Sequence, residues 1–149
     1  MVEFSKEQII DGITALKYAE YFHGAALVAC QAYAVGTVSD ISKIRESNGN
    51  SALRKLDLYK AEMIKGQEYT FVKLIDSLAN YFKYNEEWSP WPVNETTKTL
   101  RHFGINEGTE FPLYEGIQTI IGESSDLRGL CEVLEGWRFM QIEQWGRNA

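Results

Sequence analysis

The sequence contains few of the residues that crosslink a chain or bind metals: three prolines, two cysteines and two histidines among 149 residues. Cys30 and Cys131 both lie in apolar helical patterns, so we expect free thiols and a reducing, cytoplasmic location. Without a close pair of cysteines or histidines, a zinc site of the Cys-x-x-Cys type is excluded. We therefore predict no metal and no cofactor.

Motifs for nucleophilic catalysis are also absent. The sequence has no Gly-x-Ser-x-Gly segment and no glycine-rich phosphate loop, and neither cysteine has a histidine nearby in sequence. Glu20 and His23 have the spacing used by carboxylate-bridged di-metal bundles, but a second copy is missing because Thr99 precedes His102 at the matching position. The sequence thus identifies no enzymatic activity, although it does not exclude one.

Long apolar runs and excess positive charge are lacking as well. The longest apolar run is residues 25–30, whereas a membrane span needs about 20 residues, and Met1 to Ser5 do not resemble a secretory leader. The net charge is −6, from 15 basic and 21 acidic residues. Residues 43–65 are locally basic but have no interleaved aromatic platform. We expect no membrane contact and consider a nucleic-acid partner unlikely.

The sequence does contain apolar residues at steps of three and four along most of its length, which indicates helices. The pattern predicts one long helix over about residues 6–38 and a second from residue 53 to 84, capped by Ser51 and kinked at Gly66. Three shorter helices follow. The first is capped by Asn94 and ends at Gly104 in a Schellman motif, the second has Pro112 in its first turn, and the last is capped by Ser124 or Ser125. We predict a single all-α domain over residues 1–149, a helical bundle built on a long antiparallel helix hairpin covered by three shorter helices.

The candidate functional region combines aromatic rings with both signs of charge, which is typical of interface centres. Its residues are Lys83, Glu86, Glu87, Trp88, Trp91, Arg101 and His102. A purely structural interpretation remains open, in which the two tryptophans close one end of the bundle and Lys83 pairs with Glu87, four residues later.

The segment from Ala79 to Trp88 resembles a stretch that reads A-N-Y-F-K-H-x-x-E-W in small uncharacterised bacterial helical proteins. This sequence has Tyr84 where that pattern has histidine. Separately, a bacterial helical bundle resembles the HEPN ribonucleases in shape, so a HEPN-like fold is compatible with this sequence. The HEPN signature is an arginine separated by several residues from a histidine, whereas Arg101 and His102 are adjacent.

Two functions are compatible with these observations. The first is a small acidic cytoplasmic protein that binds another protein with a basic surface, in the manner of immunity proteins or phage-encoded inhibitors of bacterial defence. The alternative is an RNA-processing enzyme of HEPN-like shape, or its inactive remnant, with Lys83, Glu87, Arg101 and His102 as its polar cluster. An enzyme requires these four side chains to converge in a pocket, whereas a binding protein requires an apolar surface with an acidic rim.

Overall fold

The computed structural model describes residues 6–59, 68–123 and 126–146. These residues form an all-α fold without strands. The helices are α1 (Lys6–Ser47), α2 (Lys55–Tyr59), α3 (Phe71–Tyr84), α4 (Glu95–His102), α5 (Pro112–Ile121) and α6 (Arg128–Gln141), with a 3₁₀ turn at Asn85–Glu87 and a π-helical turn at Ile142–Gly146.

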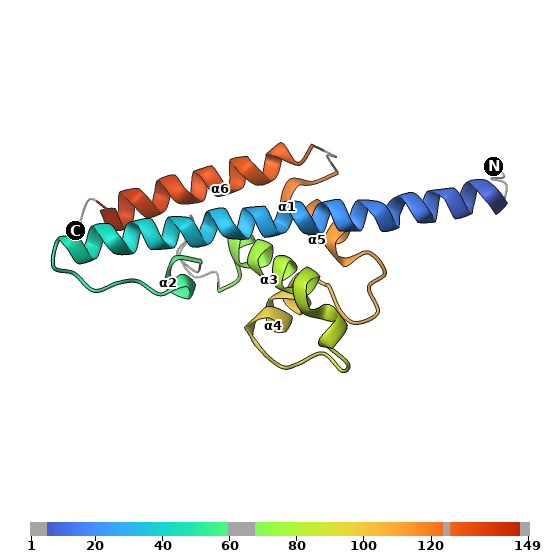
Figure 1. Ribbon diagram of the computed structural model, residues 1–149, viewed down its shortest axis with the longest axis horizontal. Coiled ribbons are helices and arrows are strands. Elements are labelled where there is room, and N and C mark those ends of the chain that lie inside the picture. Colours follow the sequence, from blue (N-terminus) through green and yellow to red (C-terminus); the bar gives the residue numbers. More distant parts are fainter. Residues whose placement is uncertain (1–5, 60–67, 124–125, 147–149) are drawn as a thin grey trace.

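Helix α1 is the spine of the molecule, with α6 along one side and α2 to α5 along another (Figure 1). It is longer than the sequence predicted, because Val38 and Ile41 are buried in the core and continue the helix beyond Gly36. It ends at a turn in which Gly49 adopts a φ of 80° and the amide of Asn50 bonds to the carbonyl of Arg45. A positive φ favours glycine, which explains the stop.

The return arm of the predicted hairpin is not one continuous helix. The described residues 68–70 are non-helical, and the Thr70 side chain accepts a hydrogen bond from the amide of Lys73 to open α3 as a new helix. Gly66, the predicted kink, lies outside the described residues, and Ser51 lies four residues before α2 and does not cap it. Apolar spacing alone missed this break because the apolar phase continues across it.

The sequence signals for helix ends predicted the structure better than apolar spacing did. Asn94 caps α4 in a capping box, and Pro112 occupies the first turn of α5. Gly104 has a φ of 82°, and the amide of Ile105 bonds to the carbonyl of Leu100, which is the predicted Schellman ending. The predicted caps of the last helix, Ser124 and Ser125, lie outside the described residues.

Helix α3 is the centre of the core. Every residue from Val72 to Ala79 is buried, and α3 contacts α1, α4, α5 and α6. Glycines permit the closest approaches: a Cβ on Gly24 would lie 2.2 Å from the ring of Phe82, and one on Gly116 would lie 2.5 Å from Leu78. The central helix is therefore fixed by backbone contacts with both α1 and α5.

The first turns of α1 extend beyond the body of the molecule (Figure 1). They leave Ile9, Ile13 and Leu16 exposed. By length and composition alone, α1 is long and apolar enough to cross a membrane. However, 39% of its most apolar 18-residue stretch is buried inside the fold, and a core helix of a soluble protein can be equally long and apolar.

Candidate functional site

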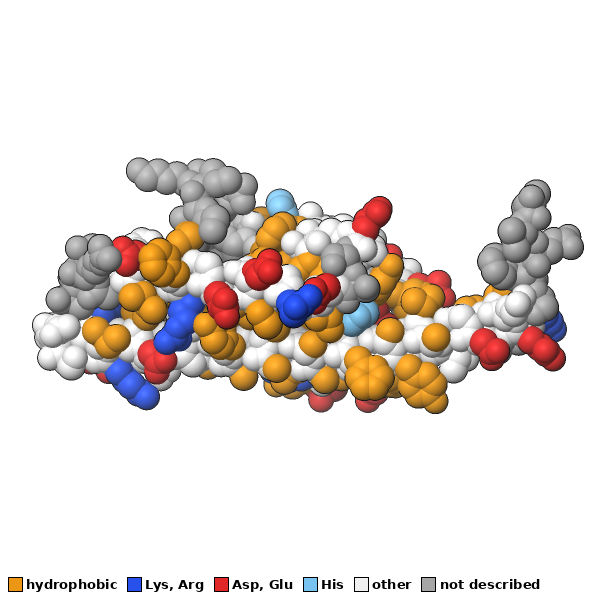
Figure 2. Space-filling model, turned by 90° about the horizontal axis from the view of Figure 1, so that it is seen from above, with side chains coloured by type: hydrophobic (Ala, Val, Ile, Leu, Met, Phe, Trp, Pro, Cys, Tyr) orange, Lys and Arg blue, Asp and Glu red, His pale blue; other side chains and the backbone are white. Residues whose placement is uncertain are grey.

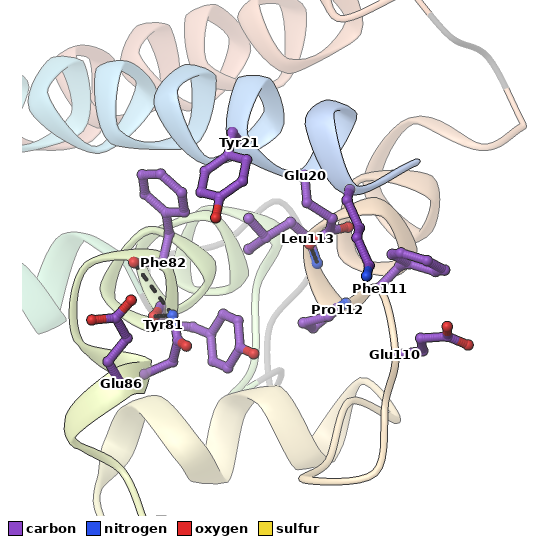
Figure 3. A pocket seen from close by; sticks show the side chains of 11 residues that line it. Glu20, Tyr21, Tyr81, Phe82, Glu86, Glu110, Phe111, Pro112 and Leu113 are labelled. Atoms are coloured by element: carbon purple, nitrogen blue, oxygen red, sulfur yellow. Dashed lines mark hydrogen bonds between the residues drawn. The ribbon is translucent and has the colours of Figure 1, made fainter. Parts of the chain in front are cut away.

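A pocket of about 360 Å³ lies where α1, the end of α3 and the start of α5 meet. Figure 3 shows Tyr21 reaching into it from α1 and Tyr81 lying on the α3 side, with Glu86 and Glu110 at opposite ends of the lining. Its lining residues are Lys17, Glu20, Tyr21, Tyr81, Phe82, Asn85, Glu86, Glu110, Phe111, Pro112 and Leu113. The pocket thus combines aromatic and apolar walls with three carboxylates and one ammonium group.

Glu20 fixes the position of α5 relative to α1. Its carboxylate accepts hydrogen bonds from the amides of Leu113 and Tyr114, at 3.2 and 2.8 Å, and so satisfies free donors at the first turn of α5. Burial raises the pKa of Glu20 above its usual value, although the two amide bonds act in the opposite direction. Burial also raises the pKa of Tyr81, with a further contribution from the charge of Glu20.

Glu86 and Glu110 are the carboxylates available to a ligand. Both side chains are exposed, and neither makes an ion pair or hydrogen bond with any residue that the structure describes. Two unpaired carboxylates beside aromatic rings create a negative potential over an apolar surface, which favours a cationic group with an apolar stem.

An aromatic cluster adjoins this pocket through Tyr81. The rings of Tyr81, Trp88 and Trp91 lie 5.8 to 5.9 Å apart, and the guanidinium of Arg101 lies 5.5 Å from the Trp91 ring centre. Both tryptophans are half-buried and pack against the core, so each contributes to the fold as well as to the surface.

A second polar site joins α1 to α3. Gln31 donates from Nε2 to Oδ1 of Asp76 at 2.8 Å and to Oδ1 of Asn80 at 2.9 Å, and its Oε1 accepts a hydrogen bond of 2.7 Å from Lys83. Lys55 forms an ion pair of 2.7 Å with Asp76. Because each buried polar group of this network has a partner and the buried charge of Asp76 is paired with Lys55, the network connects the helices without leaving a buried charge unpaired.

The structure places the predicted site residues at several different locations. Trp88, Trp91 and Arg101 lie together in the aromatic cluster, and Glu86 lines the pocket. Lys83 belongs to the Gln31 network, and it forms no ion pair with Glu87, although both lie in a described part of the chain.

His102 has a separate environment from these residues, with its ring stacked on Tyr69 at a centroid distance of 4.2 Å. Lys83, Arg101 and His102 thus have different partners, Glu87 makes no ion pair or hydrogen bond with any residue that the structure describes, and none of the four lines the described pocket. For metal binding, the described ranges 6–59, 68–123 and 126–146 hold no group of three or more His, Cys, Asp or Glu side chains able to bind an ion.

Sequence reasoning considered Glu20 only as a metal ligand together with His23, and it missed Tyr21, Glu110 and the Gln31–Asp76 pair. Gln31 and Asp76 each carried a signal, since each is a polar residue within an otherwise apolar helical stripe. The pocket carried no such signal, because α1 and α5 contribute to it from segments more than 90 residues apart.

Comparison of the chain with models of protein families, with curated proteins and with solved structures found no significant match to any of the three.

Proposed function

We propose that this chain is a protein-binding domain whose pocket between α1, α3 and α5 receives a basic segment of its partner. The observation that supports this most directly is the combination of aromatic walls with the unpaired carboxylates of Glu86 and Glu110. The acidic net charge of −6 also favours the approach of a basic surface.

The recognition chemistry follows from the lining. A lysine or arginine side chain is able to lay its aliphatic stem on Tyr21 and Tyr81 while its charged end meets Glu86 or Glu110. The neighbouring rings of Trp88 and Trp91 supply further apolar area of the kind found at interface hot spots. We propose for this chain a role of the class of small immunity proteins or inhibitors of bacterial defence, in which binding to another protein is the function.

We prefer this role to RNA processing because of where the polar residues lie. Lys83 is engaged by Gln31, Arg101 by Trp91 and His102 by Tyr69. A hydrolytic site requires an acid or base and a charge-stabilising group within reach of one reacting atom. The separate partners of these side chains do not provide that arrangement.

The test uses a display library of random peptides selected on the folded protein, followed by titration of the enriched peptides. We expect enrichment of lysine or arginine next to apolar residues. The double substitution Glu86→Gln/Glu110→Gln should weaken binding by about tenfold or more, which corresponds to about 1.4 kcal/mol.

The matched control is Glu132→Gln/Glu135→Gln, which removes the same charge from two exposed residues of α6 and should change binding far less. Enriched peptides without basic residues, or equal effects of the two double variants, would contradict the proposal.

A further inference from the structure

One face of α1 remains uncovered although it is apolar for several turns. Between Glu20 and Asp40 the sequence has no Asp, Glu, Lys or Arg. From just before this stretch to near its end, exposed residues recur at steps of four and three, which places them on one side of the helix: Tyr18, Phe22, Ala25, Ala29, Ala32 and Gly36. Figure 2 shows hydrophobic side chains along the lower edge of the molecule, where α1 runs.

This surface, hereafter the α1 outer face, is turned away from the core. Its two large members, Tyr18 and Phe22, are 64% and 73% exposed. The opposite side of α1, with Leu27 and Ile41, is buried against the rest of the fold. Small side chains on a helix favour the close approach of another helix, yet the alanines of this face are exposed.

The α1 outer face is complementary to itself in an antiparallel arrangement. If two copies cross at the midpoint between Ala25 and Ala29, Phe22 of each copy lies opposite Ala32 of the other. Tyr18 of each copy likewise lies opposite Gly36 of the other. The space outside Gly36 is open, because a Cβ added there would meet no atom of its own chain within 4 Å. Large residues therefore face small ones on both sides of a central pair of alanines, which allows close helix packing.

Charge complementarity agrees with this register. The same two-fold symmetry places Asp11 of each copy opposite Lys43 of the other, so the dimer contains two such pairs. Both residues are exposed, and neither has an ion-pair partner within the described ranges. Opposite charges at the ends of an apolar seam favour this register and orientation over others.

We infer that two copies of this chain form an antiparallel dimer through the α1 outer face. The contact from Asp11 to Lys43 is about 48 Å long and about 10 Å wide, roughly 500 Å² per copy, which lies at the small end of specific interfaces. Interfaces of this size are typical of weak, transient association, so we expect a concentration-dependent dimer that dissociates in roughly the micromolar range. This inference is independent of the proposed peptide-binding function.

A membrane is a less suitable occupant for this face. A spanning position would bring Asp76, Lys55 and Lys83 into hydrocarbon, where charges are costly. Adsorption at a lipid surface favours an excess of lysine and arginine beside the apolar face, whereas here acids and bases flank the stretch alike: Lys17 and Glu20 before it, Asp40 and Lys43 after it.

The first experiment is sedimentation velocity on the full chain from about 1 to 200 µM, a range that spans the expected dissociation constant. We expect a shift from one chain mass to twice that mass. A single chain mass throughout would overturn the proposal. Flotation of the protein with phosphatidylcholine–phosphatidylglycerol vesicles, with loss of binding in Phe22→Ala, would also overturn it in favour of a membrane.

The second experiment compares Gly36→Leu with Gly12→Leu. A Cβ added at either glycine would have no neighbouring atom within 4 Å, and both glycines lie within α1, so each substitution fits the isolated chain and gains the same helix propensity. Only Gly36 faces Tyr18 in the dimer. Gly36→Leu should raise the dissociation constant by about tenfold or more, while Gly12→Leu should leave it within about twofold. Equal effects would overturn the proposed register.

The third experiment tests orientation through charge. Asp11→Lys and Lys43→Asp each place like charges opposite one another in an antiparallel homodimer, so each variant alone should dimerise less than the unsubstituted chain. Mixed in equal amounts, the two variants restore opposite-charge pairing, and heterodimers should form. Failure of the mixture to recover association would overturn the antiparallel arrangement.

Discussion

Gln31 donates a hydrogen bond of 2.8 Å to Oδ1 of Asp76, a residue 45 positions later in the chain. The bond joins the two helices with the most extensive contact in the fold, α1 and α3. Because both side chains are buried, the loss of either one leaves a polar group without its partner in a poorly solvated site.

Replacement of Gln31 by Leu should lower the free energy of unfolding by about 2–3 kcal/mol, because Asp76 and Lys83 each lose a hydrogen-bond partner. Urea unfolding followed by circular dichroism measures this. Ser39→Ala, at an exposed position on the same helix, serves as the control and should stay within about 0.5 kcal/mol of the unsubstituted chain. A Gln31→Leu variant as stable as this control would show that the network contributes no stability.

Gly24→Ala and Gly12→Ala should change stability in opposite directions. A Cβ at Gly24 would lie 2.2 Å from the Phe82 ring, so the ring must move, at a cost of about 1–3 kcal/mol. Gly12 has open space around it, so alanine there should stabilise the helix by up to about 1 kcal/mol. Thermal and urea denaturation of the two variants measure these changes in stability. If both substitutions changed the free energy of unfolding in the same direction, this account of α1 packing would be refuted.

Trp91→Ala should destabilise the fold by about 2–3 kcal/mol, less than the loss of a fully buried tryptophan, because the ring is half-buried. It loses its contacts with Tyr81, Trp88 and Arg101. Trp91→Phe keeps part of the cluster and should recover about half of the loss. Val93→Ala, at an 83% exposed position in the same loop, is the control. If Trp91→Ala weakened peptide binding without lowering stability, the ring would act only at the interface.

The pKa of the Glu20 carboxyl should be higher in the folded protein than the usual value for glutamate, because the side chain is desolvated by burial. Carbon NMR of the glutamate side chains measures this directly. A raised pKa means that the folded state holds the proton more tightly than the unfolded state does. The carboxyl therefore contributes less stability as pH rises from about 4.5 through its folded pKa.

Glu20→Gln lacks this titration and provides the reference for the stability measurement. The difference in unfolding free energy between the unsubstituted chain and this variant should move in favour of glutamine over that pH window. A difference that is constant with pH would mean that Glu20 is not desolvated.

The parts of the fold that the sequence predicted correctly depend on short-range chemistry. The cap at Asn94, the ending at Gly104 and the opening at Pro112 each involve residues within one or two turns of each other. A hydrogen bond between neighbours in sequence leaves its signature in the local residue pattern.

The parts that the sequence did not predict depend on which helices meet. The break before Thr70 interrupts an apolar pattern that keeps its phase, so periodicity gave no sign of it. The pocket needs Glu20 to reach the amides of Leu113 and Tyr114, a contact that becomes visible only when α5 is docked on α1. The sequence singles out Lys83 but not its partner Gln31, because nothing local links the two.

The burial of α3 from Val72 to Ala79 has a consequence for the motions of the protein. Since its residues from Val72 to Ala79 are shielded by the surrounding helices, their amide hydrogens are released to solvent only when those helices separate. Their exchange with deuterium should report global opening and be the slowest in the chain. The exposed first turns of α1, which only their own helical bonds protect, should exchange through local fraying orders of magnitude sooner.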